Sequence, residues 1–313
     1  MIVAAVGVGV LVALQSRINA ELADAVGGGL YAAAISFGTG FILVWAIVAS
    51  RSDLRASVTR IPSLISAGRL RWWQVLGGLG GAWLVTTQGL VVPVVGVTVF
   101  TIAVVAGQVS GSLVVDRAGL SPAGQLPLSA RRVVAAALAL LAVMAAGLQN
   151  GGGTITWVVL FAVSAGLGVS VQQAINGRVS MATGQPLAAT GMNFLVGFTA
   201  LLVLSVILLA LWGDFGSWPS QWWLYLGGPI GVTFIALAAW AVRGVGVLVF
   251  GLLSIGGQLL GSVALDLFLP AGGSSFGWQK WLALMLIAVA ALIATNPRAR
   301  STSGRLVARP PEP

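Results

Sequence analysis

Apolar residues fall into long runs separated by short polar segments, and this pattern predicts ten membrane-spanning helices. A run of about 20 apolar residues, rising about 1.5 Å per residue, crosses a hydrocarbon core of about 30 Å as one helix. Little of the chain is left over for a soluble domain. The predicted spans are residues 2–22, 30–50, 72–92, 95–115, 132–150, 155–177, 186–212, 221–242, 245–268 and 279–296.

The second half of the sequence repeats the first. Ten of 27 residues are identical in the longest ungapped match, ten of 22 in the second and six of ten in the third. Self-similarity on this scale indicates two copies of one structural unit. The matched stretches are 15–41 with 172–198, 95–116 with 245–266, and 72–81 with 222–231.

Each copy holds five predicted spans, so the second copy begins on the opposite side of the membrane from the first. The sequence therefore predicts an all-α integral membrane protein of ten transmembrane helices, arranged as two inverted five-helix repeats. Residues 1–150 form the first repeat and residues 151–297 the second. Residues 298–313 are basic and rich in Ser, Gly and Pro, and we expect a disordered cytoplasmic tail there.

The arginines indicate the orientation. With the N-terminus inside, fourteen of the sixteen basic residues lie in internal segments, and only Arg17 and Lys280 lie outside. This positive-inside bias predicts that both termini are cytoplasmic. The net charge of +9 thus reports topology, and without a basic, aromatic-interleaved soluble face it does not indicate a nucleic-acid partner. Fifteen arginines to one lysine suggest a GC-rich bacterial genome, so we expect a multi-pass protein of a bacterial cytoplasmic (inner) membrane.

Composition excludes several kinds of chemistry. Hydrophobic residues make up 58% of the chain and charged residues 7%, against roughly 25% charged in soluble domains. There is no histidine and no cysteine, which removes His/Cys metal sites, Ser-His catalysis and disulfides. We expect no metal, no cofactor and no enzyme activity.

The arginine-rich segment 51–71 is expected to form a short helix on the membrane surface.

Two polar motifs recur in both halves. They are Q-x-x-I-N-[AG] (Gln15, Ile18, Asn19, Ala20; Gln172, Ile175, Asn176, Gly177) and G-Q-x-x-G-S-x-x-x-D (Gly107 to Asp116; Gly257 to Asp266). With these motifs the sequence, over about residues 1–297, resembles the drug/metabolite transporter superfamily and, within it, the YdcZ-type inner-membrane exporters. The resemblance implies two kinds of partner, the surrounding membrane lipids and a small-molecule substrate whose identity it does not give. Relatives often consist of a single five-helix half that pairs with another copy, so the resemblance also leaves a homodimer as an alternative to a monomer.

Inverted repeats indicate function, because they give a protein two related conformations that open a central cavity to either side. The inverted repeats therefore predict a secondary transporter that moves a small organic molecule by alternating access, and the resemblance implies that it is an exporter. A channel or a non-transporting scaffold is the alternative. A membrane enzyme acting on lipid-linked substrates would need clustered acids, a metal site or a nucleophile–base pair, and the sequence offers none of these.

Polar side chains within spans are costly in lipid and usually face a cavity or the bundle interior. Gln15 and Asn19 lie four residues apart on one helical face, and so do Gln172 and Asn176. We expect each pair to line the cavity near its own mouth; the alternative is that these amides hold helices together. The candidate cavity residues are Gln15, Asn19, Gln108, Gln172, Asn176, Asn193 and Gln258.

Glycines, acids and tryptophans complete the set of candidates. Gly107, Gly111, Gly257 and Gly261 form matched G-x-x-x-G pairs, which predict close helix packing. Three acids near span ends are candidates for ion coupling, with simple interfacial charge as the alternative: Glu21, Asp116 and Asp266. The tryptophan pairs at 72–73 and 222–223 are expected to be interface anchors. Trp83 and Trp240, deeper in their spans, are the better candidates for stacking on an aromatic or cationic substrate.

Overall fold

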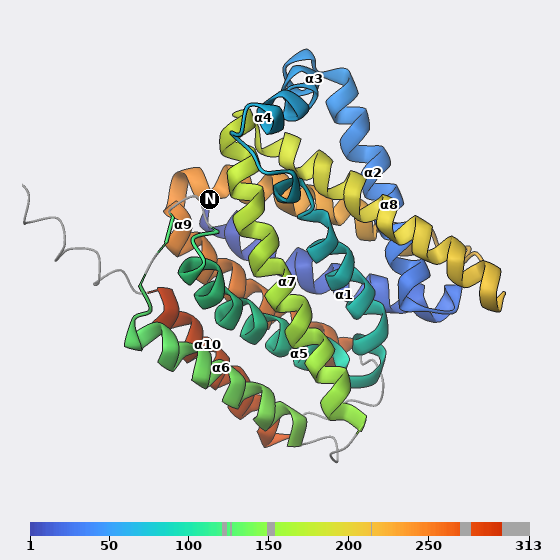
Figure 1. Cartoon of the computed structure of the whole chain (residues 1–313). Helices are drawn as coiled ribbons and strands as arrows, with labels where there is room; N and C mark the ends of the chain where they lie inside the picture. The colour runs from blue at the N-terminus through green and yellow to red at the C-terminus, as the bar shows by residue number, and fades with distance from the viewer. Residues whose placement is uncertain (121–123, 126, 149–153, 214, 270–276, 296–313) are drawn as a thin grey trace, which may run out of the picture.

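The computed structural model describes the chain except residues 121–123, 126, 149–153, 214, 270–276 and 296–313, so the predicted tail lies outside the described residues. The described part is built from helices, without strands (Figure 1). Its long helices are α1 (Ile2–Val26), α2 (Gly29–Ser50), α5 (Gly78–Arg117), α6 (Ala130–Leu148), α7 (Thr154–Thr183), α8 (Pro186–Trp212), α9 (Gly227–Phe268) and α10 (Trp278–Thr295).

The helices are apolar enough for a membrane protein. Within the described residues, six helical segments combine the length and hydropathy needed to cross a bilayer. The predicted spans 72–92 and 95–115 both fall in the segment Trp72–Arg117, which at 46 residues is more than twice the length of one span. The six segments are Ile2–Val26, Gly29–Ser50, Trp72–Arg117, Trp157–Thr183, Pro186–Trp212 and Val249–Phe268.

Short elements occupy the segments that precede α5 and α9. The arginine-rich segment forms α3 (Ser52–Thr59) and α4 (Ile61–Ser66), whose Leu54, Ile61 and Leu64 are buried. The tryptophan pairs lie in 3-10 turns, η1 (Trp72–Val75) and η2 (Trp222–Leu226), and do not start the long helices as the sequence pattern predicted. The glycines that follow each turn begin α5 and α9 close to the opposite half of the molecule.

The helices pair reciprocally between the two halves of the chain. The most extensive contacts are α1 with α9 and α5 with α7, so the first helix of each half packs against the long helix of the other. Next come α6 with α10 and α2 with α8, each joining equivalent helices of the two halves. Figure 1 shows α6 and α10 side by side at one edge, and α7 lying along α5. Neither half is a separate body.

Helix α5 is broken in its middle. Gly96 has φ 82° and ψ 167°, a backbone conformation that is essentially restricted to glycine. Pro93 precedes it and has no N–H to donate to the preceding turn. The break divides α5 into two segments at the boundary between the predicted third and fourth spans.

We expect Gly96→Ala to lower the free energy of unfolding by about 1–3 kcal/mol, because a Cβ is strained in this conformation. A Cβ at Gly96 would also lie 2.9 Å from Asp266 Oδ2. The matched control is Gly7→Ala in α1, where no atom lies within 4 Å of an added Cβ. Thermal unfolding in detergent measures both variants, and equal midpoints would contradict the strain at Gly96.

Candidate functional site

A cluster of buried amides lies where α1 meets α5 and the start of α9. Gln15 Nε2 donates to the Gly227 carbonyl oxygen at 2.7 Å. Asn19 Nδ2 donates to Gln88 Oε1 at 2.6 Å, and Gln88 Nε2 donates to Ser16 Oγ at 3.0 Å. We call these four residues, Gln15, Ser16, Asn19 and Gln88, the first amide cluster; each of them is at most 5% exposed.

Gly227 allows the first amide cluster to approach the opposite half. A Cβ at Gly227 would lie 2.3 Å from Asn19 Oδ1 and 2.6 Å from Ser36 Oγ, so any larger residue would collide with both. Asn19 itself is fully buried, and its Oδ1 has no hydrogen-bond partner within the described residues. A buried acceptor without a donor is costly, which makes Asn19 Oδ1 a candidate contact for a ligand donor.

A second cluster repeats this arrangement with the two halves exchanged. Its residues are Gln172 and Asn176 on α7 and Asn193 on α8, which is aligned with Ser36. We call these three the second amide cluster. A Cβ at Gly77 would lie 2.8 Å from Asn176 Oδ1 and 3.0 Å from Asn193 Oδ1. Gly77 is aligned with Gly227, so each cluster faces the same glycine of the other half.

The two clusters differ in burial and in hydrogen bonding. Gln15 and Asn19 are buried, whereas Gln172 and Asn176 are half-buried. Gln88, which binds Asn19, is aligned with Ala238, so its role has no equivalent in the second half. The two clusters therefore occupy equivalent positions in the two halves but differ in burial and in hydrogen bonding.

Gln108 and Gln258 belong to neither amide cluster. An added Cβ at Gly166 would lie 2.9 Å from the Gln108 backbone nitrogen, and one at Gly9 would lie 2.5 Å from that of Gln258. These two glutamines thus lie in the close contacts of α5 with α7 and of α9 with α1. Gln258 is buried and Gln108 half-buried.

The paired glycines lie in the same two contacts. An added Cβ would lie 2.1 Å from the Val163 carbonyl oxygen at Gly107 and 2.2 Å from Ser170 Oγ at Gly111, both on α7. On α1 it would lie 2.1 Å from the Val6 carbonyl oxygen at Gly257 and 3.2 Å from Val10 Cα at Gly261. The helix backbones approach closely at all four glycines, as G-x-x-x-G pairs permit.

The three acids have different partners. Glu21 forms an ion pair with Arg17 at 2.7 Å on the same face of α1. Asp116 forms an ion pair with Arg132 at the start of α6. Asp266 is 2% exposed, and its two carboxylate oxygens accept the backbone N–H groups of Val97 and Thr98, each at 2.9 Å.

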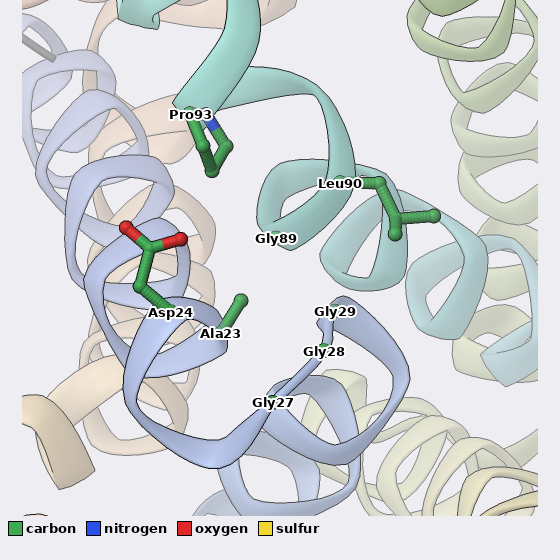
Figure 2. A pocket seen from close by; sticks show the side chains of 8 residues that line it. All are labelled: Ala23, Asp24, Gly27, Gly28, Gly29, Gly89, Leu90 and Pro93. Atoms are coloured by element: carbon green, nitrogen blue, oxygen red, sulfur yellow. The ribbon is translucent and has the colours of Figure 1, made fainter. Parts of the chain in front are cut away.

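Two hollows lie outside the amide clusters. One of about 340 Å³ lies between the end of α1, the Gly27–Gly29 link and α5, with Asp24 and Pro93 in its lining (Figure 2). The other, of about 420 Å³, lies between α2 and α9 and is lined mainly by apolar residues, including Trp240.

The other tryptophans have different surroundings. Trp83 donates its indole N–H to Ser164 Oγ at 2.9 Å. Trp72 and Trp222 are largely exposed, as interface anchors would be.

Three residues of these arrangements were missed as site candidates in the sequence. Ser16 and Gln88 have no matching residue type in the other half, so a search for repeated motifs passes over them. Lys280 is the single lysine of the chain and is 1% exposed, beside Asp266. A charged residue that is rare in the chain and lies at the edge of a span was the available signal.

Apolar helices that pair reciprocally around two amide clusters define a polytopic membrane protein. The model of a family described as "Putative inner membrane exporter, YdcZ" matches residues 1–145 and again residues 157–293. The chain therefore belongs to this family of inner-membrane exporters, as its two motifs predicted. The family is one of transporters rather than enzymes.

A solved structure described as "Crystal structure of protein" resembles the chain with a TM-score of 0.54. It is 21% identical, over 94% of each chain, which shows a common fold. No curated protein matches the sequence.

Proposed function

We propose that this protein is a secondary transporter that exports a small organic molecule, either a metabolite or a drug-like compound, by alternating access. The observation that carries the proposal is the reciprocal contact between halves, with one amide cluster from each half placed against the equivalent glycine of the other. Two related halves of this kind can exchange their conformations, which opens a site between them to alternate sides.

The proposed topology has ten spans in two inverted repeats, with both termini in the cytoplasm of a bacterial cell. Helix α5 has 40 residues, or about 60 Å, which is twice a hydrocarbon core of about 30 Å. Its break at Gly96 would let it cross the bilayer twice. The arginine distribution supports the orientation, which places the first amide cluster toward the outside and the second toward the cytoplasm.

The amide clusters are the proposed substrate contacts. Carboxamides both donate and accept hydrogen bonds, and in a span they are stable only against protein, water or a polar ligand. Asn19 Oδ1 is an acceptor to which no donor of the described residues is hydrogen-bonded. A substrate with an N–H or O–H donor would satisfy it when the halves separate at this end.

The difference between the clusters supports a conformation closed at one end. Helix α1 packs against α5 around the first cluster, whereas the equivalent α7 and α9 make almost no contact over the described residues. Gln172 and Asn176 of the second cluster are correspondingly less buried than Gln15 and Asn19, while Asn193 is buried. With the proposed orientation, this conformation is closed to the outside and looser toward the cytoplasm, where an exporter takes up its substrate.

The test is counterflow in liposomes that contain the purified protein. A thermal-shift screen of metabolites and cationic drugs first selects a stabilising compound. We expect saturable uptake of that labelled compound, driven by unlabelled compound inside, because a carrier exchanges one molecule per conformational cycle. Conductance without saturation would identify a channel instead. If no selected compound gave either counterflow or conductance, the protein would be a non-transporting membrane scaffold.

A further inference from the structure

The carboxylate of Asp266 bridges the two halves at the break in α5. It lies near the end of α9 and accepts the backbone N–H groups of Val97 and Thr98, the first residues after Gly96. Both hydrogen bonds are 2.9 Å long and buried. A Cβ at Gly96 would lie 2.9 Å from Asp266 Oδ2, so only glycine leaves room for this carboxylate.

The contact has a clear physical basis. The first N–H groups of a helical segment have no carbonyl partner in the preceding turn, and the break at Gly96 creates such a start inside the bundle. A carboxylate there satisfies two donors and interacts favourably with the positive end of the helix dipole. Hydrogen bonds to a charged group are among the strongest in proteins, and burial shields both of these hydrogen bonds from water. Asp266 therefore holds the second segment of α5 to the opposite half.

The equivalent acid of the first half makes a different contact. Asp116 is aligned with Asp266, yet it pairs with Arg132 of α6 within its own half. Asp266 also has a base of its own half beside it, the buried Lys280 of α10. Each acid thus has a base that follows it in the chain, and Asp266 in addition binds across the halves.

We propose that Asp266 is a positioning residue that latches the outer end of the transporter closed, and that opening breaks its two hydrogen bonds to the α5 amides while Lys280 stays beside it. In the open state Asp266 would then keep only the base of its own half, which is the arrangement that Asp116 has with Arg132. Asp116 would take up the reciprocal contact with α9. This inference rests on the proposed function, because it assumes that the two halves exchange conformations.

A single cysteine reports the opening without any substrate. The chain contains no cysteine, so Ser36→Cys introduces one thiol, at a position that is 1% exposed and faces Gly227. Its labelling by a membrane-impermeant thiol reagent from the outside measures how often this end opens. We expect Asp266→Asn in this background to label about tenfold faster, because the asparagine side chain is neutral and has only one oxygen to accept the two backbone N–H groups.

Lys280→Gln distinguishes a latch from general stabilisation. Lys280 is beside Asp266 in this structure too, but here the carboxylate also has the two α5 amides, whereas in the proposed open state it keeps only Lys280. Removing Lys280 should therefore disfavour the open state more than the closed one and slow outside labelling. Faster or unchanged labelling in Lys280→Gln would overturn the proposed loss of the α5 contacts on opening, and this holds even where Asp266→Asn fails to fold. Asp116→Asn is the matched control, because it removes the aligned acid but should not speed labelling from outside.

The outcomes separate the latch from the proposed function. Fast labelling of Asp266→Asn, together with no counterflow by the unmodified protein, would support the latch and refute transport. Counterflow by the unmodified protein, together with parental labelling rates in a folded Asp266→Asn, would overturn the latch and leave transport standing.

Discussion

Gly257→Ala should destabilise the protein by about 3 kcal/mol, whereas Gly256→Ala, one residue earlier in the same helix, should not. A Cβ at Gly257 would lie 2.1 Å from the carbonyl oxygen of Val6 and 2.9 Å from the carbonyl carbon of the same residue. Both are backbone atoms of α1, so the two helices would have to move apart. Their contact is one of the two most extensive in the molecule.

Gly256 is the matched control for this substitution. No atom lies within 4 Å of a Cβ added there, and alanine is favoured over glycine in a helix by up to about 1 kcal/mol. The measurement is the thermal unfolding midpoint of each variant in detergent, followed by the fraction that elutes as a single species. Equal midpoints for the two variants would show that α1 and α9 do not pack through Gly257.

Asn19→Ala and Asn176→Ala should each lower the initial rate of counterflow about tenfold or more while the protein stays folded. Each substitution removes a carboxamide that we propose as a hydrogen-bond partner of the substrate in one of the two end states. The loss of a hydrogen bond between helices costs only about 0.6–2 kcal/mol, so the fold should tolerate the change. The measurement is counterflow in liposomes, beside thermal unfolding of the same preparations.

Ser205→Ala is the control for removing a buried polar group from a span. The Ser205 hydroxyl is buried and has no hydrogen-bond partner within the described residues, so its loss should lower neither transport nor stability. Unchanged transport with a lowered unfolding midpoint in Asn19→Ala or Asn176→Ala would show that these amides hold helices together instead of binding substrate.

Much of the fold could be predicted because its causes are local in the sequence. Apolar runs located the long helices, and the match of 95–116 with 245–266 located the glycines that lie in close helix contacts. The start of α5 was wrong by six residues, at 72 instead of Gly78, because an apolar pattern does not separate a 3-10 turn from the helix that follows it. The tail after residue 297 remains a prediction.

The partners within the candidate site could not be predicted from the sequence. Asn19 and Gln88 are 69 residues apart, and nothing local pairs them. Asp266 binds backbone amides of Val97 and Thr98, and a backbone partner leaves no trace in residue type. Periodicity placed Gln15 and Asn19 on one face, but the opposite surface is formed by Gly227, which has no side chain to reveal it.

The pairing of α1 with α9 also constrains how the chain can mature during synthesis. Helix α1 is made first, yet Gly227, whose carbonyl accepts the amide of Gln15, lies 212 residues later. Until that residue leaves the ribosome, the face of α1 that packs against α9 lies in lipid or against a temporary neighbour, with its amides uncovered. Such distant contacts slow folding. Insertion of α1 and completion of its tertiary contacts are therefore separate events, and the second cannot occur before α9 has been translated.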